Sequence, residues 1–508
     1  MKTLKIGTRG SLLARSQANY IKNILEKKHP QNSFKLEIIK TQGDIIQDKP
    51  LHELEGKDFF TKELDYALLS DQVDLVVHSG KDLGSDRPDG IVTAAVPKRA
   101  IANDILFIRK STQKLLTTNT FEKNNFVVGT SSPRRIAQIP YLKELLPGLS
   151  NLNLVHKNLR GNIDTRINKL VEGQYDAIIL ACAGIERVSY LEEGEQTLKA
   201  LMRDLSFSIL PLKTHTPAAA QGALIIETLG KNQECLQMIS FLNHQETRSE
   251  ILQEKKIFNQ NGGTCYLPLG IYVKGNALYK SGKNLKELEI KSIESLNALP
   301  KISKQENIFI GLTKKVHNQV LCDEFIEKYS IQSETKSSKN SLLATNHSLE
   351  NFKNVEHTGL IFSSGVSSMK TLAKNAYWCH GCFDSQGEKA LEQMKSSKSF
   401  NLMADFNAPW KIFTNKESLS DYGEIIPSYA RKLVDISSEY EQKLKNCKVF
   451  YWTSFYQYQK YSERFEFLSL NDIVHFTGLG KTHLEFEQRS IAHTPIASYE
   501  ILINTYLS

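Results

Sequence analysis

The chain has 508 residues and a mass of 57.5 kDa, which is too long for one hydrophobic core and predicts two to four domains. Its 40% hydrophobic and 24% charged residues are typical of a globular protein, and its 28 glycines and 14 prolines exclude collagen-like and low-complexity chains. The net charge of +8 does not indicate a nucleic-acid partner, because arginine is concentrated in the first half and lysine supplies the charge of the second. The start has no signal-peptide core and no apolar run has membrane-spanning length, so we expect a cytoplasmic protein with no membrane partner.

Short β-branched segments alternate with amphipathic segments from the N-terminus to residue 227. Helical spacing between them is clearest at Ala14, Ala18, Ile21 and Leu25. Many of the predicted strands are continuous apolar runs, which are typical of strands buried in parallel or mixed sheets. This alternation predicts α/β architecture divided between two sheets. The predicted strands are residues 3–7, 34–40, 73–79, 91–96, 104–109, 125–131, 151–156, 175–181 and 222–227.

A long helical stretch at residues 235–260 comes next, followed by the segment GGTCYLP and by strands at 269–274 and 277–280. These elements predict a small α+β domain. In GGTCYLP, glycines before Cys265 and a proline after it hold the thiol on a turn, where it is accessible. The residues alone leave four roles open for Cys265: a nucleophile, a metal ligand, a covalent anchor or a small loop residue.

Residues 281–307 are rich in lysine and weakly patterned, which indicates a linker near residue 300. Strand–helix units then resume, and the polar stretch 333–348 is a second candidate boundary. The seven cysteines are odd in number and scattered, so we expect reduced thiols.

Two short motifs in this second half are weak signals. The sequence CHGC at Cys379–Cys382 could be a redox or zinc half-site, but no second pair stands at ligand spacing, so buried cysteines and no metal site are expected. The sequence GLGKT at 478–482 lacks the P-loop glycine, because His475 occupies that position.

Basic residues occupy the first turns of expected helices, where free backbone amides favour anions and disfavour cations. In VGTSSPRR, Ser132 is the expected N-cap, Pro133 the first helical residue, and Arg134 and Arg135 follow at once. The same arrangement recurs at two other strand–helix junctions, one with Arg9 and Ser11 and the other with Arg160, Asn162 and Arg166.

One such junction would be interpreted as a solvated surface charge. Three of them in one α/β region predict a ligand rich in negative charge, because such junctions converge where open sheets bind ligands. A further strand end, after Val77, delivers Lys81 and Asp82 into a turn. The simple interpretation is an ion pair in a loop. The functional one is a carboxylate that stabilises a developing cation and handles protons beside the arginines.

Eight motifs, in this order, resemble those of the porphobilinogen deaminases, also called hydroxymethylbilane synthases, over roughly residues 3–275. The resemblance implies an enzyme that joins four porphobilinogen units head to tail, loses ammonia at each step and releases hydroxymethylbilane. It implies two periplasmic-binding-protein-like lobes, domain 1 at residues 1–102 and 198–222 and domain 2 at 103–197, with an α+β domain 3 at 223–300. The motifs are IGTRGSLLARSQ, GKDFFTKELD, VHSGKDL, VGTSSPRR, LRGNIDTRINKL, YDAIILACAGIER, PAAAQGALIIE and GGTCYLPLG.

The same resemblance implies the site residues. Asp82 falls at the position of the catalytic carboxylate, and Cys265 at the position that holds a dipyrromethane cofactor through a thioether. The other cofactor-binding positions are Lys81, Ser132, Arg134, Arg135 and Arg166, and the substrate-binding positions are Arg9, Ser11, Arg160 and Arg187.

This chain departs from the family pattern at a few loop positions. Thr264 intervenes between the glycine pair and Cys265, Gly80 and Gly84 replace a methionine and a proline, and Asp58 replaces a glycine. These departures concern the geometry of the loops more than the chemistry of the site.

The second half, residues 301–508, more faintly resembles the uroporphyrinogen-III synthases. The resemblance implies a two-lobed α/β region that cyclises hydroxymethylbilane between its lobes, with Thr453, Ser454 and Thr482 as candidate residues. Lobe A would comprise about 305–335 and 445–508, and lobe B about 340–444. The similar segments include LIFSSGVSSMKTLAK, CFDSQGEKALEQM, VFYWTSFYQYQKY and residues 475–507.

Two alternative functions stay open. One is a deaminase with an inactive C-terminal region. The other is a non-catalytic carboxylate-binding protein, because two-lobed scaffolds also hold anions at helix N-termini. Cys265 distinguishes the second alternative, since a binding module has no use for a covalent adduct. We expect a monomer whose small-molecule substrate is porphobilinogen.

Overall fold

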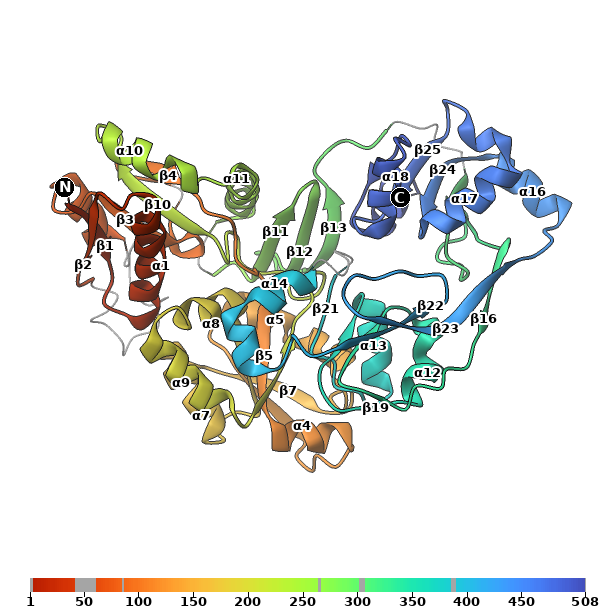
Figure 1. Ribbon diagram of the computed structural model, residues 1–508, viewed down its shortest axis with the longest axis horizontal. Coiled ribbons are helices and arrows are strands. Elements are labelled where there is room, and N and C mark those ends of the chain that lie inside the picture. The colour runs from red at the N-terminus through yellow and green to blue at the C-terminus, as the bar shows by residue number, and fades with distance from the viewer. Residues whose placement is uncertain are drawn as a thin grey trace.

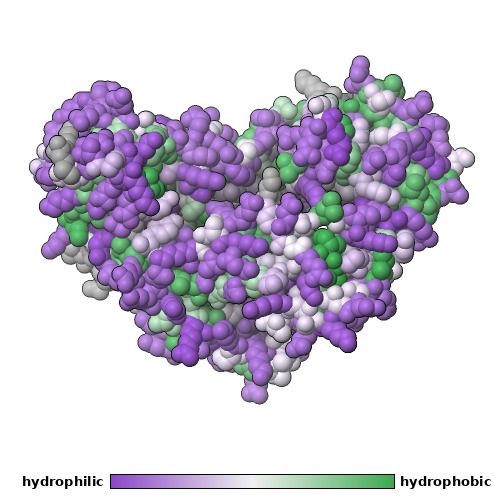
Figure 2. All heavy atoms as spheres, viewed as in Figure 1, coloured by the Kyte–Doolittle hydropathy of each residue, from purple (hydrophilic) through white to green (hydrophobic). Residues whose placement is uncertain are grey.

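The computed structural model describes residues 3–41, 61–84, 86–263, 266–300, 307–384 and 390–507. It is a mixed α/β structure, as the sequence predicts. The N-terminal sheet lies at the left of Figure 1 and the C-terminal elements at the right, and Figure 2 shows this face hollowed at its upper edge between the two. Among the described helices, none combines the length and the apolar character that a membrane crossing requires.

Domain 1 is built on a five-stranded sheet of order β2-β1-β3-β10-β4. Strands β1, β2 and β3 are parallel, and β10 is antiparallel to both β3 and β4. In the first helix, Ala18, Ile21 and Leu25 are 0% exposed, so the predicted apolar spacing does mark the buried face. The elements are β1 (Thr3–Thr8), α1 (Leu12–Lys28), β2 (Ser33–Ile38), α3 (Lys62–Leu69), β3 (Leu75–Ser79), β4 (Ile91–Ala95), β10 (Leu224–Leu229) and α10 (Gln233–Ile239).

Domain 2 is built on a second five-stranded sheet, of order β7-β6-β8-β5-β9. Strand β6 is parallel to β7 and β8, whereas β5 is antiparallel to β8 and β9. The elements are β5 (Asp104–Arg109), α4 (Lys110–Thr117), β6 (Asn125–Gly129), α5 (Pro133–Gln138), α6 (Leu142–Leu145), β7 (Asn153–Lys157), α7 (Ile163–Val171), β8 (Ala177–Ala181), α8 (Cys182–Val188), α9 (Glu192–Met202) and β9 (Leu205–Ile209).

The sheets move the predicted boundaries of domains 1, 2 and 3. Residues 198–222 were assigned to domain 1, but β9 lies in the domain 2 sheet, where Ile209 pairs with Ile105. Strand β10, assigned to domain 3, lies between β3 and β4 of domain 1. The reason is that backbone pairing with a distant strand decides the sheet to which a strand belongs, whereas the local pattern shows only that it is a strand.

Domain 3 contains one long helix against a three-stranded antiparallel sheet of order β11-β12-β13. The helical stretch predicted at 235–260 is broken, because His244 caps a new helix with its side chain accepting the backbone N–H of Thr247. The elements are α11 (Gln245–Gln260), β11 (Leu269–Lys274), β12 (Ala277–Lys283) and β13 (Glu289–Ser295).

The described C-terminal region forms two larger sheets, β15-β14-β24-β25-β26 in lobe A and β16-β23-β22-β18-β20-β21 in lobe B, and a two-stranded sheet β17-β19. The elements of lobe A are β14 (Asn307–Ile310), β15 (Val320–Cys322), α16 (Ser438–Lys445), β24 (Cys447–Trp452), α17 (Phe455–Arg464), β25 (Val474–Thr477), α18 (Lys481–Gln488), β26 (Thr494–Pro495) and α19 (Glu500–Tyr506). Those of lobe B are β16 (Ile326–Ser330), β17 (Ser337–Ser338), β18 (Asn340–Leu343), α12 (Leu349–Lys353), β19 (Glu356–His357), β20 (Ile361–Ser363), α13 (Val366–Lys374), β21 (Gly381–Cys382), α14 (Ala390–Ser396), α15 (Lys398–Met403), β22 (Trp410–Asn415) and β23 (Glu424–Leu433).

The predicted lobe boundary also moves. Residues 305–335 were assigned to lobe A, but β16 pairs antiparallel with β23 and belongs to the lobe B sheet. In Figure 1 these two long strands run up from lobe B toward lobe A. Part of the lysine-rich stretch after 281 forms the end of β12 and the whole of β13, because antiparallel pairing between these strands supplies backbone partners that its composition does not indicate.

The CHGC motif lies at the buried end of lobe B. Cys379 is 0% and Cys382 is 4% exposed, both are free thiols, and burial raises the pKa of each. Cys379 and Cys382 are therefore buried, neutral thiols, as the sequence predicts, and thiols in such surroundings are unreactive.

Candidate functional site

The strand β3 ends in a short 3₁₀ turn, Gly80–Asp82, that carries Lys81 and Asp82 side by side. Both side chains are exposed, yet loss of water to the surrounding protein lowers the pKa of Lys81, and the nearby Arg135 and Arg134 lower it further. Lys81 is thus in contact with solvent and yet surrounded by protein on several sides, so it lies in a concave part of the surface. The turn of domain 1 therefore faces the basic helix α5 of domain 2.

Helix α5 begins as predicted, with Ser132 at the N-cap and Pro133 in the first turn. Arg134 and Arg135 are buried and both bind the carboxylate of Asp104, through Nη1–Oδ2 and Nη2–Oδ1 distances of 2.8 Å. Burial alone would raise the pKa of Asp104, but the two guanidinium groups hold it well below its ordinary value. The single negative charge of Asp104 offsets only one of the two positive charges of Arg134 and Arg135. The three side chains together therefore keep a net positive charge.

Arg166 of α7, with Arg160 before it, joins this cluster, whereas Arg187 of α8 lies within range of the charge of Asp82. Burial, together with repulsion from Arg135 and Arg160, lowers the pKa of Arg166 to about 10. Burial likewise lowers the pKa of Arg187 to about 10, and Asp82 is among the charges close enough to oppose this shift. The structure therefore brings Arg135, Arg160 and Arg166 together and sets Arg187 beside Asp82. The crowded cations favour an anionic ligand.

Arg9 and Ser11 lie at the carboxyl end of β1, next to β3, with which β1 is parallel. Ser11 caps α1 as predicted, and its Oγ accepts the backbone N–H of Ala14 at 3.3 Å. Helix α1 also contacts domain 2, because the rings of Tyr20 and Tyr190 stack at 4.7 Å. The predicted substrate residues of domain 1 thus lie on the edge that faces domain 2.

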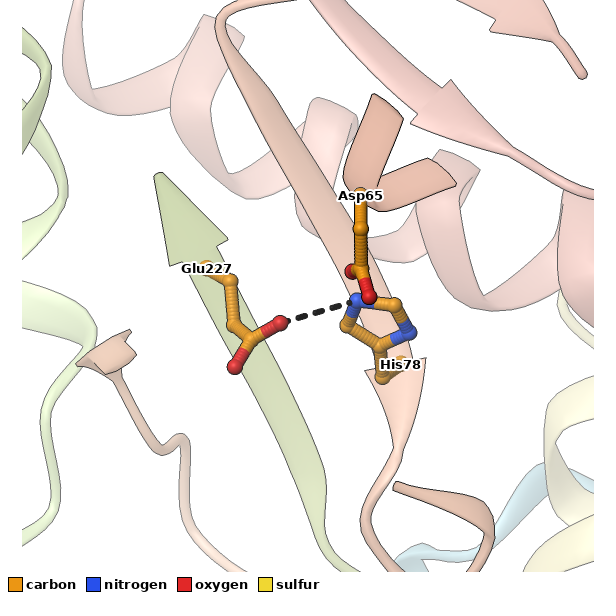
Figure 3. Close-up of side chains that lie close together, drawn as sticks. All are labelled: Asp65, His78 and Glu227. Carbon is orange, nitrogen blue, oxygen red and sulfur yellow. Dashed lines mark ion pairs between the residues drawn. The ribbon is translucent and has the colours of Figure 1, made fainter. Parts of the chain in front are cut away.

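A network of buried ion pairs that was not predicted from the sequence holds the residues on either side of the Lys81–Asp82 turn (Figure 3). Glu227 on β10 is 0% exposed and lies 3.2 Å from Nε2 of His78, which precedes the turn. Arg87, which follows the turn, donates to both carboxylate oxygens of Glu227 at 2.9 and 2.7 Å and also pairs with Asp65. One carboxylate therefore holds both ends of the segment that carries Lys81 and Asp82. The available signal was a carboxylate inside the apolar strand GALIIE, since buried charges are paired.

The ligand atoms of Asp65, His78 and Glu227 lie within 4.8 Å of one another, which is close enough for a metal ion. However, the guanidinium of Arg87 already donates to both carboxylates. The described groups are therefore better understood as an ion network than as a metal centre.

Cys265 and Thr264 lie outside the described residues, as does Asp58. On either side of Cys265, α11 ends at Gln260 and β11 begins at Leu269. Lys255 of α11 donates to the backbone oxygen of Leu83 at 2.9 Å, so this helix contacts the end of the Lys81–Asp82 turn. Gly262 has a φ of +109°, a backbone conformation that favours glycine.

The three candidates of the C-terminal region come together at one edge of lobe A. The Oγ1 of Thr453 donates to Gly311 O at 2.9 Å, and Thr482 Oγ1 contacts Thr453 O at 3.4 Å. Ser454 caps α17, with Oγ accepting from Gln457 N at 3.3 Å. These hydroxyl groups lie at the carboxyl ends of β24 and β25, where parallel sheets bind ligands.

A second basic cluster, missed in the sequence, lies on the strands that join the two lobes. Lys328 of β16 and Arg431 of β23 are directly opposite in the antiparallel register. Burial lowers the pKa of Lys328 and that of His347, and in each case neighbouring cations add to the effect. Arg431 pairs with Glu417 at 2.8 Å, which offsets one of the two charges, so the arrangement favours an anion mainly through Lys328.

A cavity of about 320 Å³ lies elsewhere, where residues 98–103 meet domain 3 and lobe B. Its lining includes Lys98, Lys274, Asp384 and Met394, and none of the predicted site residues. The cavity and the arginine cluster are therefore separate features.

Taken together, the fold and site define an α/β protein in which two sheets present a concentrated set of cationic side chains to a ligand that carries several negative charges. Residues 4–237 match the family model described as "Porphobilinogen deaminase, dipyromethane cofactor binding domain". The chain belongs to the porphobilinogen deaminase family, and this part of it is a dipyrromethane-cofactor-binding domain.

Individual relatives agree with this assignment. The chain is 39% identical over 271 residues to the porphobilinogen deaminase of Sulfurimonas denitrificans, covering 53% of this chain and 79% of the relative. It is 40% identical over 273 residues to that of Lawsonia intracellularis, covering 54% and 80%. A probable porphobilinogen deaminase of Archaeoglobus fulgidus is 37% identical over 276 residues, covering 54% and 84%. These matches span little more than half of the chain, so the family assignment rests on the N-terminal part.

Solved structures give distant overlays. The effector-binding domain of BenM with benzoate overlays with a TM-score of 0.25 and 14% identity, covering 52% of this chain and 95% of that one. Full-length CbnR in complex with its target DNA overlays with a TM-score of 0.26 and 10% identity, covering 47% and 69%. Likenesses this distant say nothing about the function of this chain.

Proposed function

We propose that the N-terminal region, residues 3–300, joins four porphobilinogen units into hydroxymethylbilane and releases one ammonia for each unit. Membership of the deaminase family supports this activity. The observation that carries it is the convergence of five arginines and one lysine around Asp82 and Asp104, with lowered pKa values at Lys81, Arg166 and Arg187. Each pyrrole of the substrate carries two carboxylates, so a bound chain would relieve the repulsion among these cations.

The proposed roles are those that the resemblance to the deaminases implies. Ser132, Arg134, Arg135, Arg166 and Lys81 hold the carboxylates of the dipyrromethane, which supplies a fixed primer for chain growth when bound. The residue that anchors it is Cys265, which lies in the sequence between α11 and β11. The cationic surroundings of the site fit a group that bears several carboxylates.

The incoming unit binds on the other side of the same turn. Arg9, Ser11, Arg160 and Arg187 hold its acetate and propionate arms, and Arg187 sets one arm beside Asp82. Asp82 is then placed to stabilise the positive charge that develops on the pyrrole as ammonia leaves, and to accept or return a proton.

The test separates a deaminase from a protein that only binds carboxylates. The purified chain, incubated with porphobilinogen, should release ammonia and form hydroxymethylbilane. Mass spectrometry of the peptide that contains Cys265 should show an added two-pyrrole unit bound through sulfur. An active protein with an unmodified Cys265 would remove the anchor assignment, and a protein that binds porphobilinogen without releasing ammonia would favour the binding module.

For the C-terminal region we propose cyclisation of hydroxymethylbilane to uroporphyrinogen III. The candidate hydroxyl groups lie at one edge of lobe A, and lobe A combines the first strands of the region with its C-terminal part, which is what the resemblance implies. The cross-strand pair Lys328–Arg431 and the nearby His347 suit a substrate with many carboxylates. Thr453, Ser454 and Thr482 would orient this substrate rather than act as strong acids or bases.

The isomer of the product tests this second activity. Hydroxymethylbilane closes spontaneously to the type I isomer, so the chain supplied with porphobilinogen should instead yield the type III isomer. Lys328→Ala combined with Arg431→Ala should shift the product toward type I while the rate of ammonia release stays unchanged. A type I product from the unaltered chain would leave the C-terminal region without this activity.

A further inference from the structure

The outer edge of the domain 2 sheet is covered by residues 378–382 of lobe B. Strand β9 ends that sheet, and its Ile209 N–H donates to the backbone oxygen of His380 at 2.8 Å. The indole Nε1–H of Trp378 donates to Phe207 O, also at 2.8 Å. Because β21 is the edge strand of the lobe B sheet, the two sheets meet edge to edge.

The hydrophobic cores of domain 2 and lobe B are continuous across this junction. One cluster combines Phe207 of domain 2 with Phe362 and Trp410 of lobe B, and the three are at most 3% exposed. A second cluster combines Ile179 with Phe413. Burial of large apolar side chains such as these is favourable because it removes their surface from water. Separating the two units would therefore expose apolar surface on both.

Domain 3 is joined to lobe A through a shared hydrophobic core. Tyr279 and Ile293 of its sheet share a buried cluster with Ile308 and Phe476 of lobe A. In Figure 1, β13 lies next to the C-terminal elements. Among the described residues, the apolar clusters around α1 and around α3 do not include residues of domain 2 or of the C-terminal region, whereas Leu83 and Ile225 of domain 1 share a smaller cluster with Ile251 of α11.

We propose that the C-terminal region holds domains 2 and 3 together as one body, and that this body is the unit that folds. The proposal rests on the proposed function in one respect: domain 2 carries the arginines, and Cys265 lies in the sequence between α11 and β11 of domain 3. The C-terminal region then fixes the anion site of domain 2 relative to α11 and β11. It would have this role whether or not it cyclises hydroxymethylbilane.

Cutting the folded full-length chain tests whether the two halves form one body. A protease recognition sequence inserted in the predicted linker at 301–306 allows cleavage after folding. The two fragments should co-elute in gel filtration and separate only in denaturant, with porphobilinogen turnover retained. Fragments that elute separately under native conditions would overturn the proposal. If the cleaved fragments co-elute but the uncut chain does not turn over porphobilinogen, the proposed function is contradicted and this inference still holds.

A matched pair of glycine substitutions tests the junction itself. A Cβ at Gly381 would lie 2.8 Å from Phe362 and 3.1 Å from the Ile209 side chain, whereas a Cβ at Gly365 meets nothing within 4 Å. Gly381→Ala should therefore push β21 away from β9 and speed amide exchange in β9 on the order of tenfold, while Gly365→Ala should leave it unchanged. Faster exchange confined to lobe B in the Gly381→Ala protein would show that domain 2 is independent and would refute the proposal.

Discussion

At the scale of single residues, the two carboxylates beside the arginines have different environments. Asp104 is completely buried and is bound by Arg134 and Arg135, so its charge is permanently engaged in the structure. Asp82 is exposed and lies beside Arg187. Asp82 is therefore the carboxylate that a substrate can reach, and Asp104 is the one that holds the arginines in place.

Replacing the exposed carboxylate tests this division. Asp82→Asn keeps the size of the side chain but removes its charge, so we expect folding to be preserved and ammonia release from porphobilinogen to fall by about 100-fold or more. The rate of ammonia release, measured alongside far-ultraviolet circular dichroism, provides the test.

Asp89→Asn is the control for this variant, because Asp89 is also exposed and lies a few residues further along the chain. It should retain the wild-type rate. An Asp82→Asn protein that is as active as this control would remove Asp82 from the chemistry.

At the scale of elements, the sequence predicts well what depends on neighbours in the chain. The N-cap positions of Ser11, Ser132 and Asn162 are confirmed, because helix starts depend on a few consecutive residues, but only Ser11 makes a side-chain capping hydrogen bond. The break that His244 introduces before α11 was missed, because histidine is not among the usual capping residues. The assignment of β9 to domain 1 was wrong because its partner strand in the sheet, β5, is distant in the sequence.

The features of the candidate site also divide into those that depend on a local sequence pattern and those that depend on contacts between distant strands. The basic strand–helix junctions and the Lys81–Asp82 turn are local patterns, and the structure brings them together. The Glu227 network and the Lys328–Arg431 pair depend on which strands are neighbours. No spacing within one segment could have indicated them.

At the scale of the whole molecule, Asp384 links the two halves of the chain. It follows β21 in lobe B, is 7% exposed, and its Oδ2 accepts the backbone N–H of Leu212 at 2.7 Å. Burial raises its pKa from 3.8 to about 7, and the nearby charge of Lys213 only partly opposes this shift. Because the folded pKa is the higher one, the folded state loses stability as the pH rises from about 4 to about 7.

Asp384→Asn should remove this loss, since asparagine still accepts the Leu212 N–H and tolerates the φ of +46° at this position. We expect the variant to gain several degrees in melting temperature at pH 8, and a smaller gain at pH 5. Thermal unfolding at the two pH values measures the difference. An equal gain at both would show that ionisation of Asp384 does not govern the joint between the halves.

The cover over β9 has a consequence for how the protein is made. Trp378 lies 171 residues after Phe207, whose carbonyl its indole binds. At roughly 5–20 residues per second, a ribosome needs about 10–30 s to synthesise that interval. During this time the edge of the nascent domain 2 sheet is complete but uncovered, and such an edge can pair with another chain. The late-synthesised lobe B residues that give the finished protein a protected edge thus leave the growing chain exposed to misassembly, and faster translation of residues 210–382 would shorten that interval.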